Sequence, residues 1–235
     1  MRDAEPDLAG HPDTLRWNAR YGAGFAASFI PHPLAVLALS MRLPDGPFID
    51  LASGPSGSAL LAAGAGRRVT VVDASDVALG LLATEAGRRG LTELITVVHA
   101  DLGTWRPRPD SYALVLCTGY WDRGLFAAAA AAVASGGLLG WQAFTAEARR
   151  SRPGLPARWC LDPGEPASLL PAGFDVLIQS DLSGATRRLL ARRRRAAEPP
   201  MEQTVRGDHD RAEDSSRTTG CLRQGVQGVQ EPDGR

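Results

Sequence analysis

Three aspartates stand at the ends of three successive apolar runs, and this spacing is the strongest chemical signal in the chain. Asp50 lies inside the first run, Asp73 ends the second, and Asp101 follows the third. Carboxylates at these places can accept hydrogen bonds from an amine, from the hydroxyls of a ribose, and from an exocyclic adenine amine. Each acid alone is ordinary, but three at successive strand ends indicate one shared ligand.

A loop of small residues follows Asp50 and would let the backbone approach a ligand closely. It reads Asp50-Leu-Ala-Ser-Gly-Pro-Ser-Gly57 and leads into a predicted helix, whose first N–H groups are free. The dinucleotide fingerprint G-x-G-x-x-G is broken, because Ser56 and Ala59 stand where its later glycines belong. Asp50 precedes the loop, which suits a positive amino group better than a pyrophosphate. Ser56 also requires a negative φ there, or a shifted loop.

Few side chains offer acid–base chemistry. Tyr120 and Trp121 follow the fourth predicted strand, where they would either wall an acceptor pocket or pack in the core, and Tyr120 is the candidate catalytic residue. His32 begins a helix and His99 ends a strand, so structural roles are expected for both. Neither histidine is assigned as a general base.

Four arginines follow the fifth predicted strand, on the side where an acceptor would arrive. Arg149, Arg150, Arg152 and Arg158 would either receive an acidic substrate or form a solvated loop in an arginine-biased protein. Composition favours the solvated loop.

The acids need a parallel sheet to bring them together, and the chain has the alternation of strands and helices that builds one. Short apolar runs alternate with helical segments through short connections, as in right-handed βαβ units. We expect an α/β, doubly wound, mostly parallel seven-stranded sheet with an antiparallel edge hairpin. The predicted strands are 48–52, 69–72, 95–98, 112–117 and 138–144, with the hairpin at 174–180 and 186–192; the predicted helices are 14–21, 32–42, 58–65, 76–89 (capped by Asp76) and 125–134 (ended by Gly136 and Gly137).

Taken together, these segments resemble the class I S-adenosylmethionine-dependent methyltransferase family over residues 17–192. FIDLASGPSG resembles the loop motif, VVDAS the ribose motif, HADL the adenine motif, SYALVLCTGYWD the fourth-strand motif, and SGGLLGWQAF the fifth strand. The resemblance implies S-adenosyl-L-methionine as cofactor, in-line methyl transfer to an unidentified small-molecule acceptor, and no metal. The cofactor-binding residues it implies are Asp50, Ala52, Ser53, Gly54, Asp73, Ala74, Asp101, Leu102 and Thr118.

Within that class the chain is most similar to small bacterial proteins related to the tellurite-resistance methyltransferases. The stretches WNARYGAG, YWDRGLF and LDPGE occur in that order. In such proteins the Trp-x-x-Arg-Tyr segment closes over the cofactor, which implies a lid containing Trp17, Arg20 and Tyr21. Ala52 replaces the first glycine of the family's loop, and we expect its extra methyl group to be accommodated easily.

Two other functions compete with methyl transfer. A nicotinamide-dependent oxidoreductase is disfavoured by the broken glycine fingerprint and by the lack of a Ser/Tyr/Lys catalytic set. A non-catalytic domain that binds S-adenosylmethionine or a nucleotide is favoured by Ser56 and by the absence of an obvious base.

Composition excludes several further classes of protein. The chain has no lysine, so a Walker A loop, a Schiff-base enzyme and a protein kinase are ruled out. A net charge of zero predicts no nucleic-acid or membrane partner. Cys117, Cys160 and Cys221 are far apart and form no CxxC pair, so we expect reduced thiols in a cytoplasmic protein.

The domain prediction places a flexible leader at 1–13, a methyltransferase domain at 14–195, and a tail at 196–235. The tail holds few apolar residues and cannot bury enough surface to offset the entropy of ordering, so we expect it to be disordered. The first residues carry acids and no apolar core, unlike a signal peptide.

Overall fold

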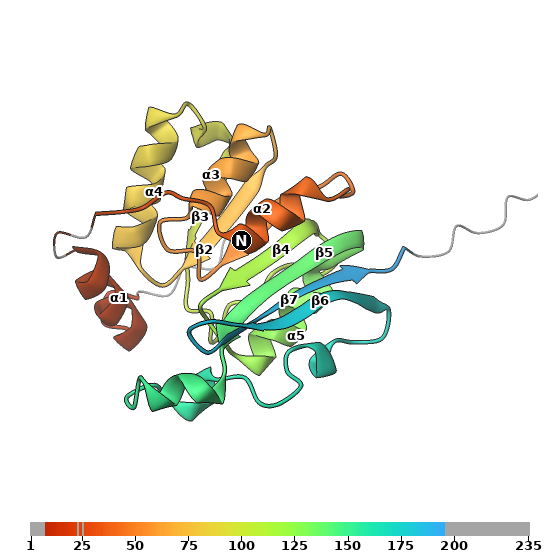
Figure 1. Ribbon diagram of the computed structural model, residues 1–235. Coiled ribbons are helices and arrows are strands. Elements are labelled where there is room, and N and C mark those ends of the chain that lie inside the picture. The colour runs from red at the N-terminus through yellow and green to blue at the C-terminus, as the bar shows by residue number, and fades with distance from the viewer. Residues whose placement is uncertain (1–7, 23, 25, 196–235) are drawn as a thin grey trace, which may run out of the picture. The chain divides into compact units, whose positions relative to one another are not determined.

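Seven strands form one sheet in the order β3-β2-β1-β4-β5-β7-β6 (Figure 1). The computed structural model describes residues 8–22, 24 and 26–195, and the predicted tail lies outside that part. The strands are β1 (Phe48–Leu51), β2 (Val69–Asp73), β3 (Ile95–His99), β4 (Tyr112–Thr118), β5 (Val133–Phe144), β6 (Phe174–Leu182) and β7 (Thr186–Arg193).

Strands β1 to β5 pair in parallel, whereas β7 pairs antiparallel with both β5 and β6. The predicted fold class is therefore confirmed. Because β6 is the outer strand, β7, which ends with Arg192 and Arg193, is an inner strand of the sheet. The strand order reverses at β1 and β4, which is where open parallel sheets bind ligands.

Helices cover both faces of the sheet (Figure 1). Phe48, Leu114 and Leu116 face α2, α3 and α4, whereas Ile49 and Val115 face α5, because successive side chains of a strand point to opposite faces. The helices are α1 (Pro12–Gly22), α2 (Pro33–Ser40), α3 (Gly57–Gly64), α4 (Asp76–Arg88) and α5 (Arg123–Ala132), with short 3-10 turns at Thr92–Leu94, Ala146–Arg150, Ala157–Trp159 and Ala167–Leu169. None of the described helices is long and apolar enough to cross a membrane.

The predicted end of α5 and the predicted cap of α4 are wrong. Helix α5 ends at Ala132 and β5 begins at the next residue, so Gly136 and Gly137 lie within a strand and do not end the helix. A Cβ on Gly137 would lie 2.8 Å from the Ala113 carbonyl oxygen, so this glycine permits a close approach between strands. The cap of α4 is Ser75 and not Asp76, since the Ser75 side chain accepts a hydrogen bond from the Ala78 N–H.

Helix α1 begins two residues before its predicted start and is docked on the start of α4. The Asn18 side chain donates to Asp76 Oδ1 at 2.6 Å and accepts from Ser75 Oγ at 2.7 Å. Leu8, in the predicted leader, is buried. The helix is therefore held in place by side chains at its own middle and by the residues before it.

Candidate functional site

A cavity of about 540 Å³ lies at the carboxyl ends of the strands, beside the reversal of strand order. This volume is within the range of about 300–1,000 Å³ that small-molecule sites occupy. Its lining comes from α1, from the loops after β1, β2, β3 and β4, and from the end of β5 and the segment that follows. The lining residues are Asp13, Arg16, Trp17, Arg20, Tyr21, Ala52, Asp73, Ala74, Asp101, Leu102, Thr118, Gly119, Tyr120, Phe144, Arg152 and Leu155.

Asp73 is the most firmly oriented acid of the cavity. Its two carboxylate oxygens accept backbone N–H groups of Gly54 and Ser75, each at 2.8 Å. Burial raises the pKa of this carboxyl, and the backbone N–H donors of Gly54, Ser75 and Ala74 oppose that rise. The carboxylate is thus fixed by backbone groups while its remaining lone pairs can accept ligand hydroxyls.

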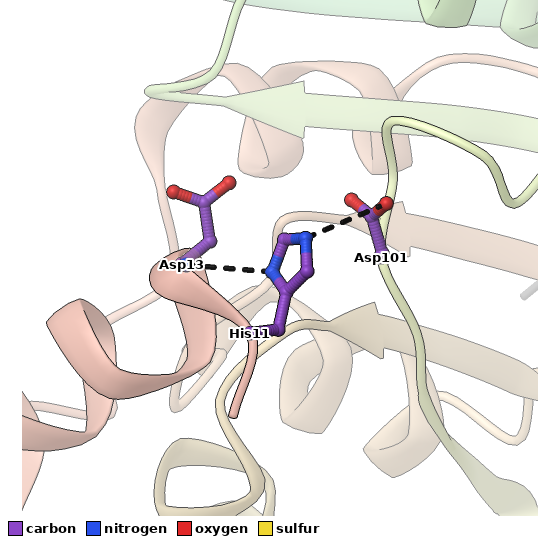
Figure 2. Close-up of side chains that lie close together, drawn as sticks. All are labelled: His11, Asp13 and Asp101. Carbon is purple, nitrogen blue, oxygen red and sulfur yellow. Dashed lines mark hydrogen bonds and ion pairs between the residues drawn. The ribbon is translucent and has the colours of Figure 1, made fainter. Parts of the chain in front are cut away.

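Asp101 lines the cavity beyond β3 and belongs to a group that the sequence did not reveal. Its Oδ1 accepts the Gly103 N–H at 2.8 Å, and its Oδ2 lies 3.8 Å from His11 Nε2. His11 is the residue before α1, and Figure 2 shows its ring between Asp13 and Asp101. The Asp13 N–H donates to the other ring nitrogen, Nδ1. Ligating atoms of His11, Asp13 and Asp101 all lie within 4.8 Å of one another. The sequence missed this group because 1–13 read as a leader.

Three of the predicted cofactor-binding residues, Asp50, Ser53 and Gly54, do not line the cavity. Asp50 is buried beneath the loop, where its Oδ2 accepts the Ser56 hydroxyl at 2.5 Å and its Oδ1 has no partner among the described residues. Burial raises the pKa of Asp50 to about 7, the Ser56 hydrogen bond opposes this rise, and the Asp73 charge adds to it. Ser56 has φ −71° and caps α3, so the expected negative φ is confirmed.

Ala52 is less easily accommodated than its size suggests. Its φ is +51°, in the left-handed region where a Cβ meets the following carbonyl oxygen. The expectation that one extra methyl group would be harmless is therefore wrong for the backbone, because it considered volume and not conformation. Gly54 is also left-handed, and the Tyr21 hydroxyl lies 2.8 Å from the point that a Cβ on Gly54 would occupy.

The three predicted lid residues all line the cavity. Trp17 and Tyr21 stack with ring centroids 6.1 Å apart, and the Arg20 guanidinium lies 5.7 Å from the Trp17 ring centroid. Burial, followed by the charge of Asp73, raises the pKa of Tyr21. Helix α1 therefore lies against the cavity through an aromatic and cationic surface.

Of the two aromatic residues after β4, one lines the cavity and the other packs in the core, which are the two roles that the sequence left open. Tyr120 lines the cavity, and Trp121 is buried in the core against Phe126 and Trp141. Burial, then the charge of Asp122, raises the pKa of Tyr120, so its hydroxyl keeps its proton near neutral pH. This argues against Tyr120 as a general base.

The histidines have the structural roles that were expected. His32 Nδ1 accepts the Leu34 N–H at the start of α2. His99 Nε2 lies 3.0 Å from the Ala74 carbonyl oxygen, which fixes the end of β3 beside the end of β2.

Of the four arginines after β5, Arg152 alone lines the cavity. It is joined there by Arg16, Phe144 and Leu155, which the sequence reasoning did not select. Phe144 is the last residue of β5, so the predicted strand 138–144 could have suggested it. The helix start at Pro12 and Asp13, with Arg16 one turn on, could have suggested Arg16.

Ion pairs fix the segment after β5. Arg123, at the start of α5, donates to Glu165 at 2.7 Å and to Asp162 at 2.7 Å. Glu165 is buried, and its Oε2 also accepts the Asp162 N–H. These bonds join the YWDRGLF and LDPGE stretches and hold the cavity's outer wall.

No protein-family model matches this sequence, and no curated protein matches it. Solved structures do match. The methyltransferase CcbJ from Streptomyces caelestis superposes with a TM-score of 0.56 at 14% identity, covering 75% of this chain and 96% of that one. Magnesium protoporphyrin IX methyltransferase from Synechocystis PCC 6803, with bound SAH, gives 0.53 at 18% identity, covering 68% and 80%. The cyclase SpnF gives 0.55 at 18% identity, covering 69% and 80%.

At these identities the similarities show the fold, which is the Rossmann-like methyltransferase fold with antiparallel strands at the sheet edge. None of the three structures is named as a tellurite-resistance protein, so the finer resemblance stays a prediction.

Proposed function

We propose that this protein transfers a methyl group from S-adenosyl-L-methionine to a small-molecule acceptor. One observation carries the proposal: the ends of β1, β2 and β3 bring Ala52, Asp73 and Asp101 to one cavity. The named methyltransferases that share the fold support it.

The side chains present fit that cofactor. Asp73 would accept the ribose hydroxyls, and Asp101 an exocyclic adenine amine. Asp50 Oδ1, beneath the loop, is a buried acceptor without a partner among the described residues, which is what the proposed contact with a cationic amino group requires. Ala52, Ala74, Leu102 and Thr118 supply the small and apolar surface between these acids.

When bound, S-adenosylmethionine supplies a methyl group already activated on a sulfonium. The protein's own residues then need only to align the acceptor and exclude water. Helix α1 covers the cavity with Trp17 and Tyr21, while Tyr120 retains its proton and can donate a hydrogen bond. An acceptor atom that is soft or already anionic fits this arrangement, because it needs no base.

The proposed lid and the finer resemblance to tellurite-resistance methyltransferases are part of the same proposal. They are supported by the position of Trp17, Arg20 and Tyr21 on the cavity wall and by the Arg123 ion pairs between the two other shared stretches.

Calorimetric titration tests cofactor binding. We expect S-adenosylmethionine and S-adenosylhomocysteine to bind and NAD not to bind. Asp73→Asn should weaken binding roughly 10- to 100-fold, because hydrogen bonds to a charged group contribute about 1.5–3 kcal/mol. Asp45→Asn is the matched control, since Asp45 is exposed and precedes β1 at the opposite end of the strand. Equal affinity in the two variants would contradict the proposal.

A binding domain without methyl transfer is the second candidate. It is favoured by the protonated Tyr120 and by the cyclase that shares the fold. A methyl-release assay over an acceptor panel separates the two, because a binding domain would take up S-adenosylmethionine and release no S-adenosylhomocysteine.

A further inference from the structure

The cavity extends beyond the surface that the proposed cofactor would need. The acids that fit an adenosyl ligand follow β2 and β3, whereas Tyr120, Phe144, Arg152 and Leu155 follow β4 and β5. Arg16 faces the cavity from α1. This second wall is the part of the cavity that remains for the methyl acceptor.

Two arginines of this wall are held by aromatic rings. The Arg152 guanidinium lies 4.3 Å from the Phe144 ring centroid, and that of Arg16 lies 4.7 Å from the Trp159 ring centroid and 5.6 Å from that of Trp17. Such stacking restrains a guanidinium while leaving the N–H groups on its edge available to a ligand.

Neither of these arginines forms an ion pair with a carboxylate among the described residues. Arg123, in contrast, is paired with both Asp162 and Glu165 in the same region. The cavity wall therefore presents two positioned cations whose charge the neighbouring protein does not neutralise.

The carboxylates that share the cavity lie toward its other end. Asp73 ends β2 and Asp101 follows β3, and a carboxylate oxygen of Asp13 lies within 4.8 Å of ligating atoms of both His11 and Asp101. Figure 2 shows these three side chains near the end of β3. The cavity is thus acidic beside β3 and cationic beside β5, and an anion is favoured at the β5 end.

From this arrangement we infer that the methyl acceptor is a small oxyanion, a carboxylate or a phosphate ester, with an apolar body. Its charged group binds Arg152 and Arg16, and its body contacts Phe144, Leu155 and Tyr120. The inference rests on the proposed function, because it assigns the β5 end of the cavity to the acceptor. Planar guanidinium groups bind both kinds of oxyanion through paired N–H donors.

Simple probes test this inference on the full chain saturated with S-adenosylhomocysteine. Benzoate and phenyl phosphate carry the two candidate anions on an apolar ring, and benzamide is the neutral counterpart of benzoate. In NMR titrations we expect at least one anion to bind about 10-fold more tightly than benzamide. Whichever anion binds more tightly identifies the oxyanion that the wall prefers.

Arg152→Gln should remove most of that preference, and the double variant with Arg16→Gln should abolish it. Arg150→Gln is the control, because Arg150 is an exposed arginine of the same segment that lies outside the cavity. Anions that bind no better than benzamide to the wild-type complex would overturn the inference, and so would a preference that survives in the double variant. Failure of S-adenosylhomocysteine itself to bind would instead contradict the proposed function.

Discussion

At the scale of single residues, the Asp50 carboxyl beneath the loop destabilises the folded protein when it is ionised. Asp50 is buried with one oxygen unpartnered, and its pKa is about 7 against an ordinary value of 3.8. A folded-state pKa above the unfolded value means that the folded protein binds the proton more tightly. The contribution of this proton to the free energy of unfolding is therefore fully present below pH 3.8 and is lost as pH rises through 7.

Asp50→Asn should remove this pH dependence. Between pH 5 and pH 8, the wild-type protein without cofactor should lose about 3 kcal/mol of unfolding free energy that the variant keeps, since one pKa unit corresponds to about 1.4 kcal/mol. Urea denaturation at the two pH values measures the difference. An asparagine oxygen can still accept a hydrogen bond from the Ser56 hydroxyl, so the variant keeps this contact of the loop. Equal losses in both proteins would show that Asp50 ionises normally.

Ala52 is a second strained residue of the loop. Because its φ is +51°, Ala52→Gly should stabilise the protein by roughly 0.5–1 kcal/mol, the left-handed penalty less the backbone entropy of glycine. The control is Ala83→Gly, on the exposed face of α4, which should cost about 1 kcal/mol. Thermal denaturation compares the two variants. If both destabilise equally, the loop does not have the described conformation.

At the scale of elements, α1 buries little of its own surface, and the Asn18 hydrogen bonds to the start of α4 lie near its middle. Its only buried residue is Thr14, so packing alone does not hold it. A helix held in this way can serve as a lid, since segments with few buried contacts open at low free energy.

Asn18→Ala should therefore loosen α1 without unfolding the sheet. Amide exchange at 12–22 should accelerate, and S-adenosylhomocysteine should bind about fivefold more weakly, which corresponds to about 1 kcal/mol for the lost hydrogen bonding. Leu15→Ala is the matched control on the same helix, because Leu15 is 58% exposed. Unchanged exchange at 12–22 in Asn18→Ala would mean that other contacts hold α1.

At the scale of the whole molecule, the sheet was the most predictable part. The runs at 69–72, 95–98 and 112–117 became strands one residue longer, because short apolar runs that end at polar residues are a local signal for the strands of a parallel sheet. The fifth strand began five residues early, since Gly136 and Gly137 resemble helix breakers in the sequence. Their actual role is a close approach to β4, which no local pattern encodes.

The site was predictable where topology alone positions a residue. Asp73 and Asp101 follow parallel strands and so had to lie at the same edge of the sheet. Arg16 and Leu155 reach the cavity only because α1 and the segment after β5 fold back over that edge. The sequence placed Asp50 correctly on its strand. The direction of its side chain depends on the hydrogen bond from Ser56, the residue that caps α3.

The same topology predicts where the chain can be shortened. Every sheet pairing of the described residues falls within 48–193, and the composition of 196–235 predicts disorder. A chain ending at Arg195 should keep its melting temperature within about 2 °C, as expected for a change of about 0.5 kcal/mol. It should also keep the stabilisation by S-adenosylhomocysteine, which is about 2.7 kcal/mol at 100 times the Kd.

A chain ending at Leu182 should lose cooperative unfolding, because it lacks β7, the strand that joins β6 to β5. If the chain ending at Arg195 melts several degrees lower or loses its response to S-adenosylhomocysteine, the tail belongs to the fold or to the site.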